Sequence, residues 1–386
     1  MKKDTKKLFM KINNTFCKRC VISINRPGMR FNSNGICYPC TVVEKNKSID
    51  WPKRKKKLDS IITWAKKNSK SSYDCVIGVS GGKDSTRQAL IARDDLGLNP
   101  LLVSCTYPPE QQSLVGASNV SNLISLGFDV EIIGPKPELW KKLMKKSFYK
   151  YGNWARPTEL ALYSIPPRIA ISKGIPLMLL GENNALISGD SGGSKNEVAN
   201  DIKFNNTLAG GEISEWNKIA NFKNDMYWYR FPEEKDFLKT KLKMVYLGFF
   251  YQDFNQENNY LIAKKNGLKI KNLNRKDIGA LNIFEDLDED FVHVNQLLKY
   301  FKFGFARASD DASHMIRNKK ITRDEGIKLV KKYEGKCHPR YIKAFCKYIK
   351  ISEKEFWKVA NSFRNKKIWK LKNKRYSLID PIWNIK

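Results

Sequence analysis

The chain lacks the long apolar runs that mark membrane and exported proteins. No apolar run is long enough to span a bilayer, and the Lys-rich N-terminus has no apolar stretch of the signal-peptide kind. We therefore expect a soluble, cytoplasmic protein. Histidine is also scarce: only His293, His314 and His338 occur, and no two of them have the close helical spacing of a metal site. We expect each of the three to be structural.

Acidic residues are few, because 39 Asp and Glu stand against 71 Lys and Arg, which gives a net charge of +32. On its own this charge would suggest nucleic acid, an acidic membrane surface or a phosphorylated small molecule as a partner. The basic residues are spread along the chain, however. The densest run, Lys53 to Lys57, is typical of a solvated linker or the start of a helix. The charge therefore does not identify the partner.

Cysteine is concentrated near the N-terminus, where two C-x-x-C pairs occur, Cys17 with Cys20 and Cys37 with Cys40. Their spacing is that of a zinc ribbon or knuckle. Two disulfides are disfavoured because nothing indicates export from the reducing cytoplasm. A redox role is disfavoured because neither pair opens a βα unit. Four cysteine ligands leave no coordination position for water, so we expect a structural zinc ion.

The stretch from Asp74 to Ser85, DCVIGVSGGKDS, has the pattern of a phosphate-binding loop. An apolar, β-branched run predicts a buried strand over Cys75–Val79, and helical spacing of apolar residues follows through Leu96. Two consecutive glycines between strand and helix let backbone N–H groups converge on an anion, and the helix N-terminus and Lys83 add positive charge. Asp84 stands where a Walker loop requires Ser or Thr, which excludes that class.

Further strands are predicted after this loop, alternating with helices at βαβ spacing. Such alternation implies a parallel sheet, in which ligands bind at the carboxyl ends of the strands. The predicted strands are Cys75–Val79, Pro100–Tyr107, Phe128–Ile133 and Pro176–Leu180. Three segments should therefore share one rim of the sheet: Ser80–Ser85, Ser104–Tyr107 and Gly181–Asn183.

We expect three regions: a zinc ribbon and linker over residues 1–57, an α/β nucleotide-binding domain over 58–235, and a mainly helical region over 236–386. The segment from 185 to 225 is rich in Gly, Ser and Asn, and we interpret it as a lid over the ligand rim. Within the helical region, Thr322 with Glu325 and Ser352 with Glu355 have the form of capping boxes.

SGGKDS resembles the signature of the PP-loop ATP pyrophosphatases, whose fold is adenine nucleotide alpha hydrolase-like. These enzymes cleave ATP between the α and β phosphates and pass AMP to a carbonyl oxygen. With the C-x-x-C pairs, the Arg-Pro-Thr-Glu segment ending at Glu159, the Gly-Glu-Asn segment at 181–183 and KFGFARASDDAS at 302–313, the chain resembles the N-acetyl sugar amidotransferase family. It departs from the family pattern at Ala306, where Gly is usual, and at Trp154-Ala155, where Pro and Cys are expected.

This resemblance implies an activity and a set of site residues. The expected reaction converts an acetamido group of a nucleotide-activated bacterial surface sugar, of the kind found in lipopolysaccharide O-antigens, into an acetamidino group with ATP and Mg²⁺. The implied catalytic residues are Lys83, Asp84 and Ser85. The implied ATP-binding residues are Ser80, Gly81, Gly82, Lys83, Asp84, Ser85, Ser104, Gly181 and Asn183. The implied sugar-binding residues are Glu159, Lys302, Arg307, Asp310 and Asp311.

The source of ammonia is missing from the sequence. A glutaminase triad needs a nucleophilic Cys with a His and a carboxylate in reach, and Cys337-His338 is the only adjacent Cys-His pair. Adjacency in sequence does not make a triad. The resemblance implies that a separate glutaminase subunit, with a cyclase-like barrel protein to conduct ammonia, supplies it.

Two other readings stay open. A PP-loop tRNA-modifying enzyme, either a thiolase or a lysidine-type ligase, would account for the positive charge. Thiolases use a central cysteine pair, however, and only Cys75 and Cys105 lie between Cys40 and Cys337, each inside a predicted buried strand. A non-catalytic nucleic-acid-binding zinc protein would leave SGGKDS unexplained. We therefore expect no nucleic-acid partner and no membrane contact.

Overall fold

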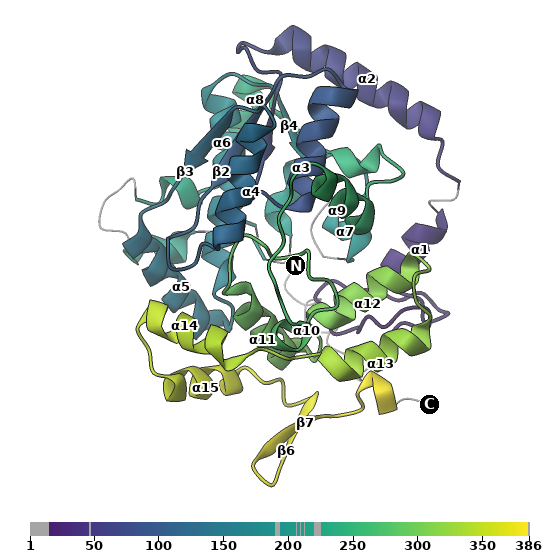
Figure 1. Ribbon diagram of the computed structural model, residues 1–386, viewed down its shortest axis with the longest axis vertical. Coiled ribbons are helices and arrows are strands. Elements are labelled where there is room, and N and C mark those ends of the chain that lie inside the picture. Colours follow the sequence, from purple (N-terminus) through teal and green to yellow (C-terminus); the bar gives the residue numbers. More distant parts are fainter. Residues whose placement is uncertain are drawn as a thin grey trace, which may run out of the picture.

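A computed structural model describes residues 15–45, 48–189, 194–205, 207–208, 210–211, 213–219 and 225–384. A parallel sheet with helices on both faces forms one end of the molecule (Figure 1). The cysteine-bearing segment and the C-terminal helices form the other end. A two-stranded antiparallel hairpin of β6 (Trp369–Lys372) and β7 (Arg375–Leu378) projects beyond them.

The sheet has five parallel strands in the order β3-β2-β1-β4-β5. They are β1 (Cys75–Gly78), β2 (Pro100–Cys105), β3 (Val130–Ile133), β4 (Leu177–Leu180) and β5 (Lys243–Tyr246). From β1 the chain proceeds outward to β2 and β3, then crosses back to β4 and continues outward to β5. The topological switch point therefore lies between β1 and β4, where a ligand crevice is expected in an open parallel sheet. The α/β fold and its four predicted strands are confirmed.

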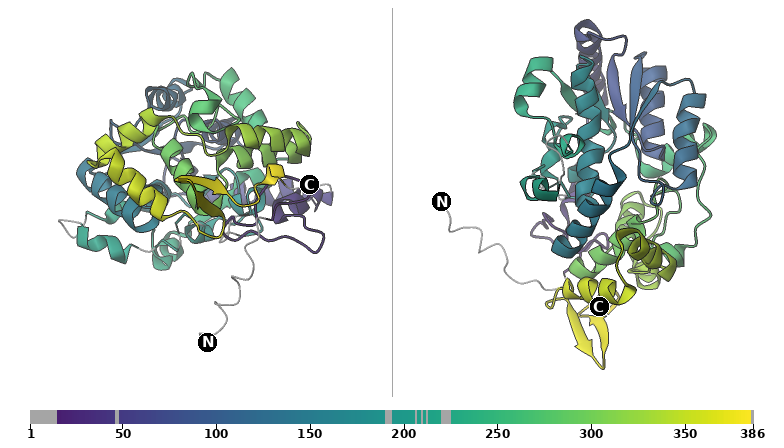
Figure 2. Two further views of the ribbon diagram at one scale, coloured as in Figure 1. Left: turned by 90° about the horizontal axis from the view of Figure 1, so that it is seen from below. Right: turned by 90° about the vertical axis from the view of Figure 1, so that its left-hand side faces the viewer.

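Alternating side chains of the strands are buried on opposite faces of the sheet, as the period of two requires. Ile77 packs in a cluster with α2 (Trp51–Asn68), α3 (Lys83–Leu90) and α4 (Leu114–Ser125). Val76 packs in a second cluster with α5 (Pro137–Tyr151) and α6 (Ala155–Ser172). Figure 2 shows helices on both sides of the sheet. Burial on both faces explains why the strands read as continuous apolar runs.

Two parts of this region differ from expectation. The predicted helix from Ser85 to Leu96 is α3 followed by a π-helical turn over Ile91–Asp95. The fifth strand, β5, was not predicted, since a mainly helical region was expected beyond residue 235. It pairs with β4 from Leu177↔Lys243 to Leu180↔Tyr246.

The segment interpreted as a lid forms short elements: α7 (Asn184–Ile187) and 3-10 turns at Asn200–Phe204, Ser214–Ile219 and Tyr227–Tyr229. Residues 190–193, 206, 209, 212 and 220–224 of this segment lie outside the described residues. Leu208 and Trp216 are fully buried in the core that also holds Val76. A movement of this segment stays a prediction.

The C-terminal region is helical, as expected. Its helices are α8 (Glu234–Thr240), α9 (Gln256–Lys265), α10 (Arg275–Ile278), α11 (Val292–Phe303), α12 (Arg307–Arg317), α13 (Arg323–Tyr333), α14 (Pro339–Ile349) and α15 (Glu353–Ser362). The capping box of Thr322 and Glu325 is confirmed at α13. At α15, Ser352 accepts from the N–H of Glu355, but the reciprocal bond is not among the contacts of the described chain. None of the helices in the described ranges is both long and apolar enough to cross a membrane.

Candidate nucleotide site and metal centre

The glycine loop lies at the switch point of the sheet and borders a cavity of about 350 Å³. The prediction that the three segments share one rim of the sheet is confirmed. The cavity is lined by Ser80 and Gly82 after β1, by Cys105 and Tyr107 at the end of β2, and by Gly181 after β4. Gly82 is the N-cap of α3 and has no side chain to cap the helix. The first N–H groups of α3 therefore lack intrahelical acceptors and lie at the cavity, where an anion can accept from them.

The backbone conformation and the surroundings of residue 81 allow only glycine there. Its φ is +75°, and a Cβ there would lie 2.7 Å from the backbone nitrogen of Val120 in α4. Gly82 differs, since a Cβ would meet only Ser80 Oγ, at 3.5 Å. The first glycine thus allows the loop to pack against α4, and the second leaves space beside the cavity.

Lys83 does not line the cavity. Its side chain is 3% exposed, and its ammonium pairs with Asp84 at 2.6 Å and with Glu285 at 2.8 Å. Burial alone would lower the pKa of Lys83, but Asp84, Glu285 and Glu182 together raise it above its ordinary value. Lys83 is therefore a charged group held by buried carboxylates in this state of the protein.

Two of these carboxyls, Glu182 and Glu285, are residues that the sequence analysis did not single out. Burial and the charge of Asp84 raise the pKa of Glu182 to about 8. Burial also raises the pKa of Glu285, which the charge of Lys83 partly offsets. Glu182 lies inside the Gly-Glu-Asn segment, so its place on the rim could have been inferred. Glu285 lies in a loop far along the chain, and no local pattern marks it.

Asp84 and Glu182 are two of the three carboxylates that line the cavity, and the third, Asp288, accepts from Tyr107. The side chain of Asp84 is 33% exposed, and its other oxygen accepts from Asn259 at 2.8 Å. Hard oxygen ligands of this kind suit Mg²⁺, which commonly takes one or two carboxylates together with substrate phosphates. These two residues could hold a magnesium ion against a bound triphosphate.

Other residues assigned to ATP fall in different places. Ser85 and Asn183 line the cavity with Gly181. Ser104 is 3% exposed and is not among the lining residues. Since side chains alternate along a strand, Ser104 faces away from the side that Val103 and Cys105 present to the cavity. Tyr107 and Asp288, which were not assigned individually, line the cavity and are joined by a 3.1 Å hydrogen bond from the tyrosine hydroxyl.

The residues assigned to the sugar are held by other protein groups. Both Asp286 oxygens accept from Arg307, at 2.6 and 2.7 Å. Asp310 pairs with Arg26 and Lys299, and these two cations lower its pKa despite its burial.

The other residues assigned to the sugar either bond to other protein groups or do not line the cavity. Asp311 accepts from the N–H groups of Leu281 and Asn282, and burial raises its pKa to about 7. Burial lowers the pKa of Lys302 to about 8, and its ammonium donates to the carbonyl of Tyr151 at 3.1 Å. Glu159, near the start of α6, is not among the lining residues of the nucleotide cavity.

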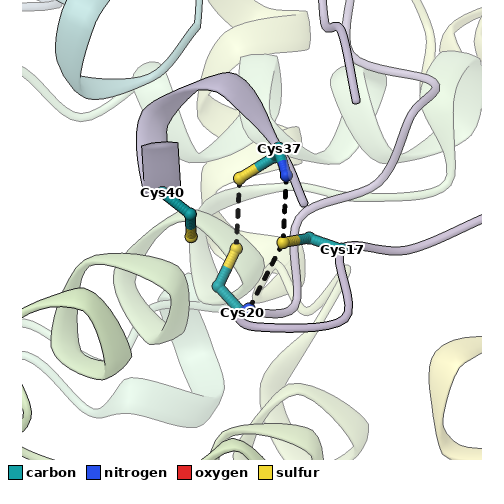
Figure 3. Close-up of side chains that lie close together, drawn as sticks. All are labelled: Cys17, Cys20, Cys37 and Cys40. Atoms are coloured by element: carbon teal, nitrogen blue, oxygen red, sulfur yellow. Dashed lines mark hydrogen bonds between the residues drawn. The ribbon is translucent and has the colours of Figure 1, made fainter. Parts of the chain in front are cut away.

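The four N-terminal cysteines form one buried cluster, in which all four Sγ atoms lie within 4.8 Å of one another. Figure 3 shows the sulfurs converging from two turns of the chain, the second at the start of α1 (Tyr38–Lys45). The N–H groups of Arg19, Cys20 and Cys37 donate to Cys17 Sγ at 3.3 to 3.5 Å. Thiols this close, with N–H donors directed at one sulfur, match the tetrahedral four-thiolate set of a structural zinc site.

The cysteine cluster is attached to the C-terminal helices. Arg323 donates to the carbonyls of Cys20 and Cys17 at 3.2 and 3.4 Å. Arg317, at the end of α12, approaches Cys20 Sγ at 3.9 Å and donates to the carbonyl of Ile187 at 3.1 Å. The metal centre is thereby connected through α12 to the segment that follows β4.

Comparison with known proteins gives one match in sequence. Residues 281–382 match the family described as "LPS biosynthesis protein WbpG-like, C-terminal domain". No curated protein matches the chain.

Two solved structures are similar over more than half of this chain. One is a predicted subunit of tRNA methyltransferase from Methanocaldococcus jannaschii, at 14% identity over 58% of this chain and 86% of that chain, with a TM-score of 0.27. The other is an NH3-dependent NAD synthetase from Campylobacter jejuni, at 17% identity over 59% of this chain and 100% of that chain, with a TM-score of 0.29. Scores this low carry no argument about function.

The match in sequence includes Glu285 and Asp288, the residues that reach the glycine loop and the cavity. It confirms the resemblance over this part of the chain. Over residues 281–382 the chain is therefore similar to the WbpG-like C-terminal domain of lipopolysaccharide biosynthesis proteins.

Proposed function

We propose that the chain is an ATP-dependent amidotransferase that converts the acetamido group of a nucleotide-linked bacterial surface sugar into an acetamidino group. The observation that carries the proposal is the junction of two parts of the chain at one site. Glu285 pairs with Lys83 of the glycine loop, and Asp288 lines the same cavity. Both lie within the segment that matches lipopolysaccharide biosynthesis proteins. Residues of the matched segment therefore lie at the glycine loop and at the cavity beside it, which supports the proposal.

The chemistry that fits this site activates a poor electrophile. The acetamido carbonyl oxygen attacks the α-phosphorus of ATP, the bond from that phosphorus to the bridging oxygen of the β-phosphate breaks, and pyrophosphate leaves. Ammonia then adds to the carbonyl carbon, the carbon–oxygen bond breaks, and AMP leaves with the former amide oxygen. One proton is released for each ammonia incorporated as the neutral amidine. The N–H groups at the start of α3 would stabilise the departing charge.

The supply of ammonia belongs to the proposal. Cys337 and His338 do not form a nucleophilic pair, because His338 Nδ1 caps α14 by accepting from the N–H of Arg340 at 3.2 Å. Burial raises the pKa of Cys337 to about 12, which keeps its thiol protonated at neutral pH. A separate glutaminase, with a cyclase-like barrel protein as the conduit, would therefore deliver ammonia to the activated sugar.

The cysteines outside the N-terminal cluster give little support to the tRNA-thiolase alternative. Cys75 and Cys105 lie in separate core clusters on opposite faces of the sheet. Burial raises the pKa of Cys105 to about 12, so its thiol is a poor sulfur carrier. A lysidine-type ligase, which needs no cysteine pair, is the version of this alternative that an experiment must address.

The test incubates the purified protein with ATP, an ammonium salt and a panel of free and nucleotide-linked N-acetyl sugars. We expect one AMP and one pyrophosphate per sugar, and a product whose mass shows one oxygen replaced by NH. A parallel incubation replaces the sugars with unmodified tRNA and free lysine. AMP release that requires tRNA, or a panel in which no sugar is changed, would refute the proposal.

A further inference from the structure

A second cavity, of about 420 Å³, adjoins the nucleotide cavity. The two share Glu182 and Asn183, which follow directly after β4. The walls of the second cavity come from α1, the first turn of α2, α7, the turn between β5 and α9, and the end of α12. The helices α1, α7 and α12 lie toward the right of the view in Figure 1. Its size is that of a small-molecule site.

The lining of this second cavity is basic. The cations of the lining are Arg54 and Arg317, since burial lowers the pKa of His314 to about 3 and leaves it neutral; the single acid among the lining residues is Glu182, at the shared boundary. Arg317 is already opposed by the cysteine cluster, whose Cys20 Sγ it approaches. Positive charge is therefore concentrated at the wall formed by α2, away from the boundary with the nucleotide cavity.

Arg54 is the cation on that wall that lacks an anion. One of its N–H groups donates to the carbonyl of Phe249 at 2.5 Å, and its guanidinium lies 3.6 Å from the centre of the Phe249 ring. Glu197, the acid whose charge acts on Arg54, pairs with Lys57. Within the described ranges no carboxylate forms an ion pair with Arg54. A guanidinium fixed in this way, with its remaining donors at a cavity, suits a phosphate or carboxylate.

We propose that the second cavity is the acceptor site. In this arrangement Arg54 binds the anionic carrier group of the acetamido sugar, and the acetamido carbonyl reaches the Glu182–Asn183 boundary to meet the α-phosphate. The inference rests on the proposed function and names the place of its sugar. It moves the site away from Arg307, Asp310 and Asp311, whose charged groups are already paired with or bonded to other protein groups. Aromatic rings and the amides of Gln252 and Gln256 in the lining suit a hydroxylated ring.

The test compares Arg54→Gln with Arg93→Gln in the sugar-dependent release of pyrophosphate. Arg93 is a matched control, because it also donates to a backbone carbonyl, that of Leu126, and stacks on an aromatic ring, that of Phe128, but lies outside both cavities. For Arg54→Gln we expect a KM for the sugar about 10- to 100-fold higher, from the loss of one charged hydrogen bond. The KM for ATP should stay within about twofold of wild type. Arg54→Lys should restore part of the loss.

A second variant keeps the test independent of Arg54. Leu186→Trp enlarges a side chain of α7 that lines only the second cavity. It should abolish sugar-dependent turnover while ATP still binds with wild-type affinity, measured by titration calorimetry. If the wild type modifies a sugar but neither substitution changes the KM for that sugar, the acceptor binds elsewhere and the proposed function stands. If the wild type modifies no sugar of the panel, the proposed function fails and the acceptor site fails with it.

Discussion

The ammonium of Lys83 lies 2.8 Å from a carboxylate oxygen of Glu285, although 201 residues separate them in the sequence. The pair joins the glycine loop to the C-terminal region that matches lipopolysaccharide biosynthesis proteins. Both partners are largely buried, with side chains 3% and 14% exposed. The loop lysine is therefore part of the protein's internal charge balance as well as a candidate ligand for phosphate.

Lys83→Ala should abolish pyrophosphate release that depends on ATP and the sugar, and it should also destabilise the fold. Removal of one partner of a buried ion pair typically costs about 3–5 kcal/mol of unfolding free energy. The loss should be smaller at pH 4 than at pH 8, because Glu285 without the ammonium has a raised pKa and is disfavoured when charged. Urea unfolding at both pH values measures this.

The double variant Lys83→Ala/Glu285→Gln should recover part of that stability at pH 8, since no unpaired charge is then left buried. It should recover none of the activity. If the changes in unfolding free energy of the two single variants simply add up to that of the double variant, the two residues do not interact. If Lys83→Ala still releases pyrophosphate in a sugar-dependent way, Lys83 has no catalytic role.

Gly81→Ala should destabilise the protein much more than Gly82→Ala. Alanine at 81 would need the left-handed backbone, at a cost of order 1–3 kcal/mol, and its Cβ would collide with the backbone of α4. We expect a lowered Tm and loss of binding of a fluorescent ATP analogue. Alanine at 82 has an ordinary backbone conformation and free space, so its Tm should fall only by the small amount that alanine costs at an N-cap. Equal effects from the two substitutions would contradict the loop geometry.

Glu182→Gln should change how stability depends on pH. Because the pKa of Glu182 is raised to about 8 in the folded protein, folding favours its protonated form. In the wild type, the contribution of Glu182 to the free energy of unfolding therefore falls as pH rises from about 4.5 to about 8. The glutamine variant has no such loss, because its side chain does not titrate in this range. We expect equal Tm values near pH 4.5 and a higher Tm for the variant at pH 8.5. A variant that is less stable at pH 8.5 would show that the carboxylate is stabilised there.

Metal analysis of the purified protein should find about one zinc per chain. Cys37→Ser should lose the metal and lower the Tm, since three thiolates remain of a buried set of four. Cys337→Ser, which changes a cysteine outside the cluster, should keep both. A wild-type sample that is fully folded without metal would refute the zinc assignment.

The sequence was sufficient for most of the sheet and the loop. β1, β2 and β4 are mainly apolar runs, whereas the edge strand β3 contains Glu131 among three apolar residues. β5 could not be predicted, because Lys243–Tyr246 is only four residues long and begins with an exposed lysine. Its place in the sheet depends on pairing with β4, which no local pattern records.

Side-chain pairing over long distances explains the other differences. Arg307 and Asp310 stand in a polar segment typical of a binding site, but the structure pairs them with Asp286 and Arg26. Nothing distinguished Glu285 from the other acids of the run at 285–290, because acidic residues in a loop are normally solvated. The predicted strand order was enough to infer which rim of the sheet holds the site. The ion-pair partners of the charged residues at that rim depend on the position of a loop far along the chain, which the strand order does not record.

The attachment of the cysteine cluster to α13 has a consequence for the making of the protein. Arg323 donates to the carbonyl of Cys17 across 306 residues of sequence. At roughly 5–20 residues per second, the ribosome completes that interval in some tens of seconds. During this time residues 17–40 have left the ribosome but the surface on which they dock does not yet exist. A metal ion bound by the four cysteines would hold this segment together in that interval, and we expect zinc supply during translation to affect the yield of correctly assembled chains.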